Sequence, residues 1–284
     1  MNTLQPPAVR RPASPLRVRQ PHVDWVSERI SARDWLIVEL INRLRIVTGA
    51  QIERVLFSSL SSPRSRTASR SRALRRLVSW RVVMPLGRRV GGAGRGSSVM
   101  VFALDTVGQQ LLRQRLRRGT SSDEITRVRR PIAPGTRTLA HALAVAELHT
   151  CLAEDGRRHD FIVEAFETEP ACWWPNGLGG YLKPDAYARL AWNSAVDHWW
   201  VELDMATEAL PTVRTKLTAY LDFIARGQLG PHGLLPRVLL AVPAGRRADA
   251  VAGLVRRLPE PAERLFAIAV HDRAPRLMSE ILRE

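Results

Sequence analysis

A polar segment in the middle of the chain separates two different orders of predicted secondary structure. Residues 118–137 read RGTSSDEITRVRRPIAPGTR, with two prolines and few apolar side chains, a composition typical of a linker. The 284 residues of the chain are enough for two domains, each with its own core. We therefore expect an α+β chain of two domains joined by a linker over residues 119–137.

The part before the linker reads as three helices and a glycine-rich hairpin. Helices are predicted over residues 34–44, over 48–56 with Thr48 as N-cap, and within the arginine-rich segment 61–80. Two strands, RVVMPL and VMVFAL, flank the tip GRRVGGAGRGSS, and a further helix follows from Thr106 to Leu116. This order is typical of a winged helix-turn-helix domain, which we place at residues 31–118. Residues 1–30 are rich in arginine and proline, and we expect them to form a disordered basic tail.

The part after the linker, residues 138–284, follows the order α-β-β-β-α-β-α-β. A nearly apolar helix is predicted over residues 139–153, which indicates burial on several sides. The later helices are expected at 212–226 and 246–258, and the strands at 161–167, 181–190, 198–205, 238–242 and 265–270. The order predicts a mixed sheet with helices packed against it.

The excess of positive charge is confined to the first part of the chain. The formal net charge is +16, but residues 1–130 carry 26 arginines and 8 acids, a net charge of +18, whereas the remainder has a net charge of −2. No acidic residue occurs between Arg54 and Leu104. Such an excess is tolerated most easily when a polyanion relieves the repulsion, so the first domain is predicted to bind double-stranded DNA. The arginines expected to contact DNA from the third helix and the hairpin tip are Arg64, Arg66, Arg70, Arg72, Arg75, Arg76, Arg88, Arg89 and Arg95.

Three carboxylates are predicted to meet at the end of the sheet in the second domain. The strands read YLKPDAYARLAW and HWWVELDMATE, and side chains alternate across a strand, so Glu202 and Asp204 share one face. A tight hairpin would bring Asp185 of the first strand beside them. Converging carboxylates need a divalent cation, and oxygen ligands select Mg²⁺ or Mn²⁺, which activates water for phosphodiester cleavage. The predicted metal ligands are therefore Asp185, Glu202 and Asp204.

The chain is almost free of lysine, and its only two lysines flank these acids. Of 43 basic residues, 41 are arginine, and the exceptions are Lys183 and Lys216. A lysine at such a position suggests that a compact charge is needed at a water or a phosphoryl oxygen. Lys183 would share a strand face with Asp185, and Lys216 lies on the next helix, facing back towards the sheet.

This arrangement resembles the PD-(D/E)xK nuclease superfamily, which has the restriction-endonuclease-like fold. In that pattern Asp185 matches the first acid and Glu202 the second, but the lysine would fall at position 204, where this chain has Asp204. The resemblance implies catalytic roles for Asp185 and Glu202, with Lys216 or Lys183 replacing the missing lysine. Acids are also frequent in the first helix of the superfamily, which makes Glu147 a further candidate.

The tandem of the two domains resembles the replication-relaxation family of mobile-element proteins. The similarity is carried by VFALDTVGQQLL, HALAVAELHTCL, KPDAY and VELDMATE…KLTAYLDF in this order, from about Arg33 to Val270. It implies a protein that nicks or relaxes plasmid DNA for replication or transfer.

Other polar residues of the second domain allow more than one interpretation. Glu208 is either part of the site or an acid near the start of the next helix. Glu147 could instead be a partly exposed helix acid, and His141 and His149 are expected either to pack or to face the linker. Only three tyrosines are present, without a cluster of three histidines on neighbouring strands, which argues against a relaxase with a covalent tyrosine. Tyr220 is expected to be structural.

These features predict a metal-dependent DNA endonuclease that nicks or relaxes DNA of a plasmid or integrated element. Two cysteines cannot build a disulfide framework, and no apolar run suits a membrane span, so we expect a cytoplasmic protein associated with the nucleoid or a plasmid. Its partners would be double-stranded DNA, and a second copy or other replication or transfer proteins. The main alternative is a non-catalytic DNA-binding regulator or replication accessory with a degenerate nuclease fold. A third is a winged helix joined to a small-molecule sensor domain.

Overall fold

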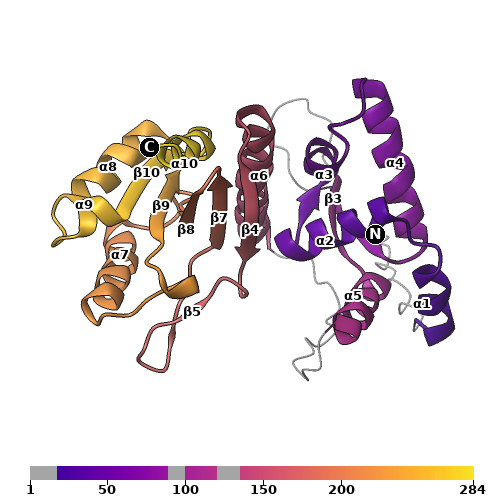
Figure 1. Cartoon of the computed structure of the whole chain (residues 1–284), viewed down its shortest axis with the longest axis horizontal. Coiled ribbons are helices and arrows are strands. Elements are labelled where there is room, and N and C mark those ends of the chain that lie inside the picture. Colours follow the sequence, from indigo (N-terminus) through magenta and orange to yellow (C-terminus); the bar gives the residue numbers. More distant parts are fainter. Residues whose placement is uncertain (1–17, 89–99, 120–134) are drawn as a thin grey trace, which may run out of the picture.

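The computed structural model describes residues 18–88, 100–119 and 135–284. Figure 1 shows two halves, one on each side of the long helix α6 (Thr136–His159). The chain has a mixed α+β fold, as predicted, with a five-stranded mixed sheet in the second half.

Helices that begin at polar caps form most of the first half. The side chains of Ser31, Thr48 and Ser62 accept hydrogen bonds from backbone amides at the starts of three helices, which satisfies donors that lack a partner within the helix. The elements are α1 (Gln20–Ser27), α2 (Ala32–Leu44), β1 (Val47–Thr48), α3 (Gly49–Leu56), α4 (Pro63–Ser79), β2 (Val83–Arg88), β3 (Met100–Leu104) and α5 (Thr106–Gly119). The strands pair antiparallel in the order β1-β3-β2.

Helix α1 corrects the prediction that residues 1–30 are a disordered tail. Val23 and Val26, three positions apart and thus on one helical face, are fully buried in the core of the first half. The His22 ring bonds the carbonyl oxygen of Trp80 at 3.1 Å. Proline near the start of the segment suggested disorder, but Pro21 occupies the first turn of α1, where no amide donor is needed. Residues 1–17 lie outside the described chain.

The second half is built on a sheet with the strand order β10-β9-β8-β7-β4. Strand β7 runs antiparallel to both of its neighbours, β4 and β8, whereas β8, β9 and β10 run parallel through helical crossovers. After α6 the elements are β4 (Ile162–Thr168), β5 (Trp174–Pro175), β6 (Tyr181–Leu182), β7 (Ala186–Trp192), β8 (Ala195–Leu203), α7 (Leu210–Ala225), a 3-10 turn (Pro231–Gly233), β9 (Arg237–Val242), α8 (Gly245–Val255), α9 (Ala262–Leu265), β10 (Phe266–Val270) and α10 (Ala274–Ile281).

One buried apolar cluster extends from the first half through α6 into the sheet. It joins Ile41 and Leu44 of α2 to Leu152 of α6 and to Trp199 and Val201 of β8. A second cluster packs the opposite face of the sheet against α7 and α8. The predicted linker lies largely outside the described residues, but the two halves are packed together through a continuous core.

Candidate functional site

Asp185 and Glu202 lie side by side at one end of the sheet. The backbone amide of Asp185 donates to the carbonyl oxygen of Val201 at 2.9 Å, and its Oδ2 accepts a 2.7 Å hydrogen bond from the amide of Leu203. Asp185 is therefore hydrogen-bonded to both sequence neighbours of Glu202. The carboxylates of Asp185 and Glu202 share one face of the β7–β8 pair. Glu202 is 8% exposed.

Helix α7 brings Lys216 and Tyr220 to Glu202. Lys216 Nζ lies 3.7 Å from Glu202 Oε2 and 3.1 Å from Glu208 Oε2, so Glu208 belongs to the site as well. The hydroxyl of Tyr220, one helical turn further along, donates a 2.6 Å hydrogen bond to Glu202 Oε1. The expectation that Tyr220 only packs is incomplete, since it holds one of the predicted catalytic residues.

The buried carboxylate of Glu202 is difficult to ionise. Burial and then the charge of Asp185 raise the pKa of Glu202 to about 8, although Lys216 and Tyr220 act in the opposite direction. For Lys216, burial lowers the pKa, but Glu202 and Glu208 outweigh burial and the pKa is raised. A cationic lysine thus faces two close carboxylates, one of which retains its proton near neutral pH.

We expect Glu202 to make the metal-free protein less stable as the pH rises. The folded protein keeps a proton on Glu202 up to about pH 8, whereas the unfolded chain loses it near the ordinary value of 4.5, so the folded state binds more protons in this window. The contribution of Glu202 to the free energy of unfolding should fall by at most about 1.4 kcal/mol per pH unit. Glu202→Gln should remove this slope, measured by urea unfolding between pH 5 and 9. Parallel profiles for the two proteins would contradict the raised pKa.

Asp204 does not join the carboxylate pair, which corrects the predicted set of three ligands. Strand β8 ends at Leu203, and Asp204 Oδ2 accepts a 2.5 Å hydrogen bond from Arg247 Nε of α8. The backbone carbonyl oxygen of Asp204 also contacts Nε2 of His271 at 3.0 Å. Throughout the described residues, no three histidine, cysteine, aspartate or glutamate side chains are grouped closely enough to hold a metal ion.

Lys183 is also placed differently from the prediction. Strand β7 begins at Ala186, while Tyr181 and Leu182 form β6, which pairs with β5. Lys183 therefore precedes the strand, and its ammonium group lies 4.6 Å from the ring centre of Trp173. Lys216, and not Lys183, is the lysine beside the carboxylates.

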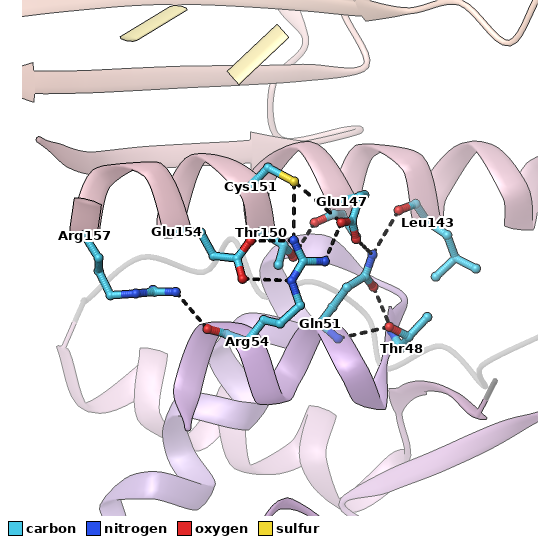
Figure 2. A network of polar contacts seen from close by, with 10 residues as sticks. Thr48, Gln51, Arg54, Leu143, Glu147, Thr150, Cys151, Glu154 and Arg157 are labelled. Atoms are coloured by element: carbon cyan, nitrogen blue, oxygen red, sulfur yellow. Dashed lines mark hydrogen bonds and ion pairs between the residues drawn. The ribbon is translucent and has the colours of Figure 1, made fainter. Parts of the chain in front are cut away.

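Glu147 points into a polar network between α3 and α6 (Figure 2). It pairs with Arg54 Nη1 and accepts a 2.9 Å hydrogen bond from Gln51. Arg54 also forms two hydrogen bonds to the carboxylate of Glu154, at 2.9 and 2.6 Å. These carboxylates, Glu154 foremost, raise the pKa of Arg54. Glu147 therefore joins the two halves of the protein, and the hypothesis that it belongs to the site is wrong.

His141, which we expected to pack or to face the linker, lies at the site instead. Its Nε2 is 3.2 Å from Asp185 Oδ2, and this contact raises the pKa of His141 although burial lowers it. His149, two turns further along α6, does pack, with its ring 4.9 Å from that of Phe166. The only sequence signal for His141 was a polar side chain within a nearly apolar helix.

Helix α4, which carries six of the nine predicted DNA-contacting arginines, lies on the side of the first half away from the sheet (Figure 1). Two of them are neutralised by acids of other helices, since Arg70 pairs with Glu53 at 2.9 Å and Arg76 with the buried Asp34 at 2.7 Å. Within the described residues no acid pairs with the other four, which are Arg64, Arg66, Arg72 and Arg75. Arg88 ends β2, and Arg89 and Arg95 lie outside the described residues.

Fold and site together define an α+β protein with a carboxylate pair and a lysine at the end of a mixed sheet. The chain matches the replication-relaxation family over residues 38–238, more than two thirds of its length, and it belongs to this family. Membership suggests a role in the replication or relaxation of mobile elements. The chain matches no curated protein and no solved structure at a significant level. None of the described helices is long and apolar enough to cross a membrane.

Proposed function

We propose that the protein binds double-stranded DNA of a mobile element and cleaves one phosphodiester bond at a site made by Asp185, Glu202 and Lys216. The observation that carries the proposal is the lysine ammonium held 3.7 Å from a buried glutamate that adjoins a second carboxylate. These are the residue types that the PD-(D/E)xK pattern requires, with the lysine supplied by α7. The family role in replication or relaxation agrees with such an activity.

The carboxylate pair suits Mg²⁺ or Mn²⁺. Mg²⁺ is commonly held by one or two carboxylates, with waters and substrate phosphates completing its shell, so a third protein ligand is not required. Asp185 and Glu202 would hold the ion, and its charge would take the place of the proton that Glu202 retains. When bound, such an ion lowers the pKa of a water molecule and offsets the charge of the phosphodiester.

The side chains around the pair have separable roles. The side chain of Lys216 is 44% exposed, and its ammonium would contact a phosphoryl oxygen whose negative charge grows during cleavage. Tyr220 orients Glu202 by its hydrogen bond, and Glu208 holds Lys216 from the other side. The site thus combines two metal-binding oxygens with one cation directed at the substrate.

The first half would deliver DNA to this site through the winged helix predicted from the sequence. Its order of three helices and a three-stranded antiparallel sheet is the one expected for that fold, and α4 would be the helix that lies on DNA. Arg72 and Arg75 are exposed and face no acid within the described residues, so they are the best candidates for phosphate contacts.

Replacing Arg72 and Arg75 together with glutamine is expected to weaken binding to duplex DNA by about tenfold near 0.15 M salt. Each lost phosphate contact should also reduce the slope of log affinity against log salt by about 1. Fluorescence anisotropy with a labelled duplex over a salt series measures both quantities. Arg158→Gln, an exposed arginine of α6 paired with Asp155, is the matched control and should leave both unchanged. An unchanged slope in the double variant would remove α4 from the DNA interface.

Cleavage is tested with supercoiled plasmid incubated with the protein and Mg²⁺ or Mn²⁺. We expect open circles to accumulate, and a chelator to stop the reaction. The plasmid should carry the replication or transfer region of the element that encodes the protein, so that the substrate includes the natural DNA site.

A non-catalytic DNA-binding regulator is the second candidate, and one contact favours it. Asp204 stands at the position where the superfamily has its lysine, and its carboxylate is hydrogen-bonded to Arg247. A regulator would bind the same duplex with unchanged affinity and show no divalent-ion binding by calorimetry at millimolar metal.

A further inference from the structure

We infer that His141 is a positioning residue, which fixes the orientation of the Asp185 carboxylate. The inference rests on the proposed cleavage site and adds to it a residue from α6. It starts from the 3.2 Å contact between His141 Nε2 and Asp185 Oδ2.

The two oxygens of Asp185 are used differently. Oδ2 receives the amide of Leu203 at 2.7 Å and Nε2 of His141 at 3.2 Å. In the described part of the chain no hydrogen-bond donor reaches Oδ1. Two donors converging on one oxygen prevent the carboxylate from rotating, and Oδ1 is left for an ion or a water molecule.

The histidine is itself held in place. It is partly buried and projects from α6, which is fastened to α3 by the contacts of Arg54 with Glu147 and Glu154. The side chain of Asp185 is 13% exposed, so little water is available to replace a missing donor. Backbone and side-chain donors from β8 and α6 thus define one carboxylate orientation.

Removing the imidazole should lower the rate of cleavage and leave DNA affinity unchanged. Outer partners of metal-binding side chains typically contribute about 10–100-fold to metal affinity or activity. We expect His141→Leu to lower kcat for nicking by about 30-fold, with KM for plasmid within twofold, because helix α4, which carries the exposed arginines, lies far from the sheet in Figure 1. His141→Gln, whose amide reaches nearly as far as Nε2, should retain at least about a third of the wild-type rate.

The experiment measures kcat and KM for these two variants and the affinity for Mn²⁺ by calorimetry without DNA. His159→Leu, at the exposed end of the same helix, serves as the control and should match the wild type. A loss of kcat and of Mn²⁺ affinity in the leucine variant, restored by glutamine, supports the inference.

Two results overturn it in distinguishable ways. If the wild type nicks DNA and His141→Leu nicks equally fast, His141 has no positioning role while the proposed function stands. If the wild type neither nicks nor binds Mn²⁺, the proposed function fails, and the role of His141 fails with it.

Discussion

Asp185→Asn is expected to reduce metal-dependent nicking of supercoiled plasmid by a factor on the order of 1,000. Asparagine keeps the shape of the side chain and an oxygen for the amide of Leu203, so the backbone should be unchanged. It removes the negative charge that a divalent ion needs beside Glu202. The measurement is the initial rate of open-circle formation under single-turnover conditions with Mg²⁺.

Asp197→Asn provides the matched control for this variant. Asp197 lies near the start of β8 and pairs with Arg237 at 3.6 Å, away from the carboxylate pair at the other end of the strand. Its nicking rate should stay within about twofold of wild type, and duplex affinity should be equal in all three proteins. A nicking rate for Asp185→Asn close to that of wild type would refute the assigned site.

Arg54→Met is expected to lower the free energy of unfolding by about 2–3 kcal/mol. Methionine retains the apolar stem but leaves Glu147 and Glu154 facing each other without the cation between them (Figure 2). The side chain of Arg54 is 33% exposed, and solvent screening keeps the loss below that of a fully buried ion pair. Urea unfolding followed by tryptophan fluorescence measures the change.

Arg158→Met tests whether any arginine on this surface would have the same effect. Arg158 pairs with Asp155 on the same helix and is 66% exposed, so its loss should cost less than about 0.5 kcal/mol. Equal destabilisation by the two substitutions would show that the Arg54 network contributes no more to the free energy of unfolding than an exposed ion pair does. A broader transition for Arg54→Met alone would indicate that the halves then unfold separately.

The order of secondary-structure elements was predictable because local signals agreed with the final packing. Thr48 caps α3 as its sequence position indicated, and alternating apolar residues marked β7 and β8 within a few positions. Helix α1 was missed because contacts with residues far along the chain stabilise it, namely the burial of Val23 and Val26 and the bond between His22 and Trp80. The start of β7 was misplaced because Tyr181 and Leu182 pair with β5 instead.

The candidate site was partly predictable for a similar reason. Spacing along adjacent strands brought Asp185 and Glu202 together, and the scarcity of lysine drew attention to Lys216. Side-chain partners that come from distant elements could not be predicted from the sequence. Arg247 of α8 forms a hydrogen bond to Asp204, and no sequence pattern near either residue predicts this contact.

The unpredictability of tertiary contacts also explains why Glu147, a predicted site residue, lies outside the site, whereas His141 lies in it. Both lie on α6, and an isolated helix gives no indication of which neighbour each face meets. One face of α6 contacts α3, where Arg54 pairs with Glu147. His141 instead contacts Asp185 at the end of the sheet. Tertiary contacts, not helical periodicity, assign the two roles.

The contacts of α6 also decide how this protein could be recombined with a relative. A chimera of two relatives joined within residues 119–137 would follow the apparent domain boundary in the sequence. It would nevertheless place the Arg54 of one parent against the Glu147 and Glu154 positions of the other. A functional hybrid therefore needs α3 and α6 to come from the same parent, or their facing residues to be exchanged as a set. The first half of this protein can therefore be exchanged as a unit only together with helix α6.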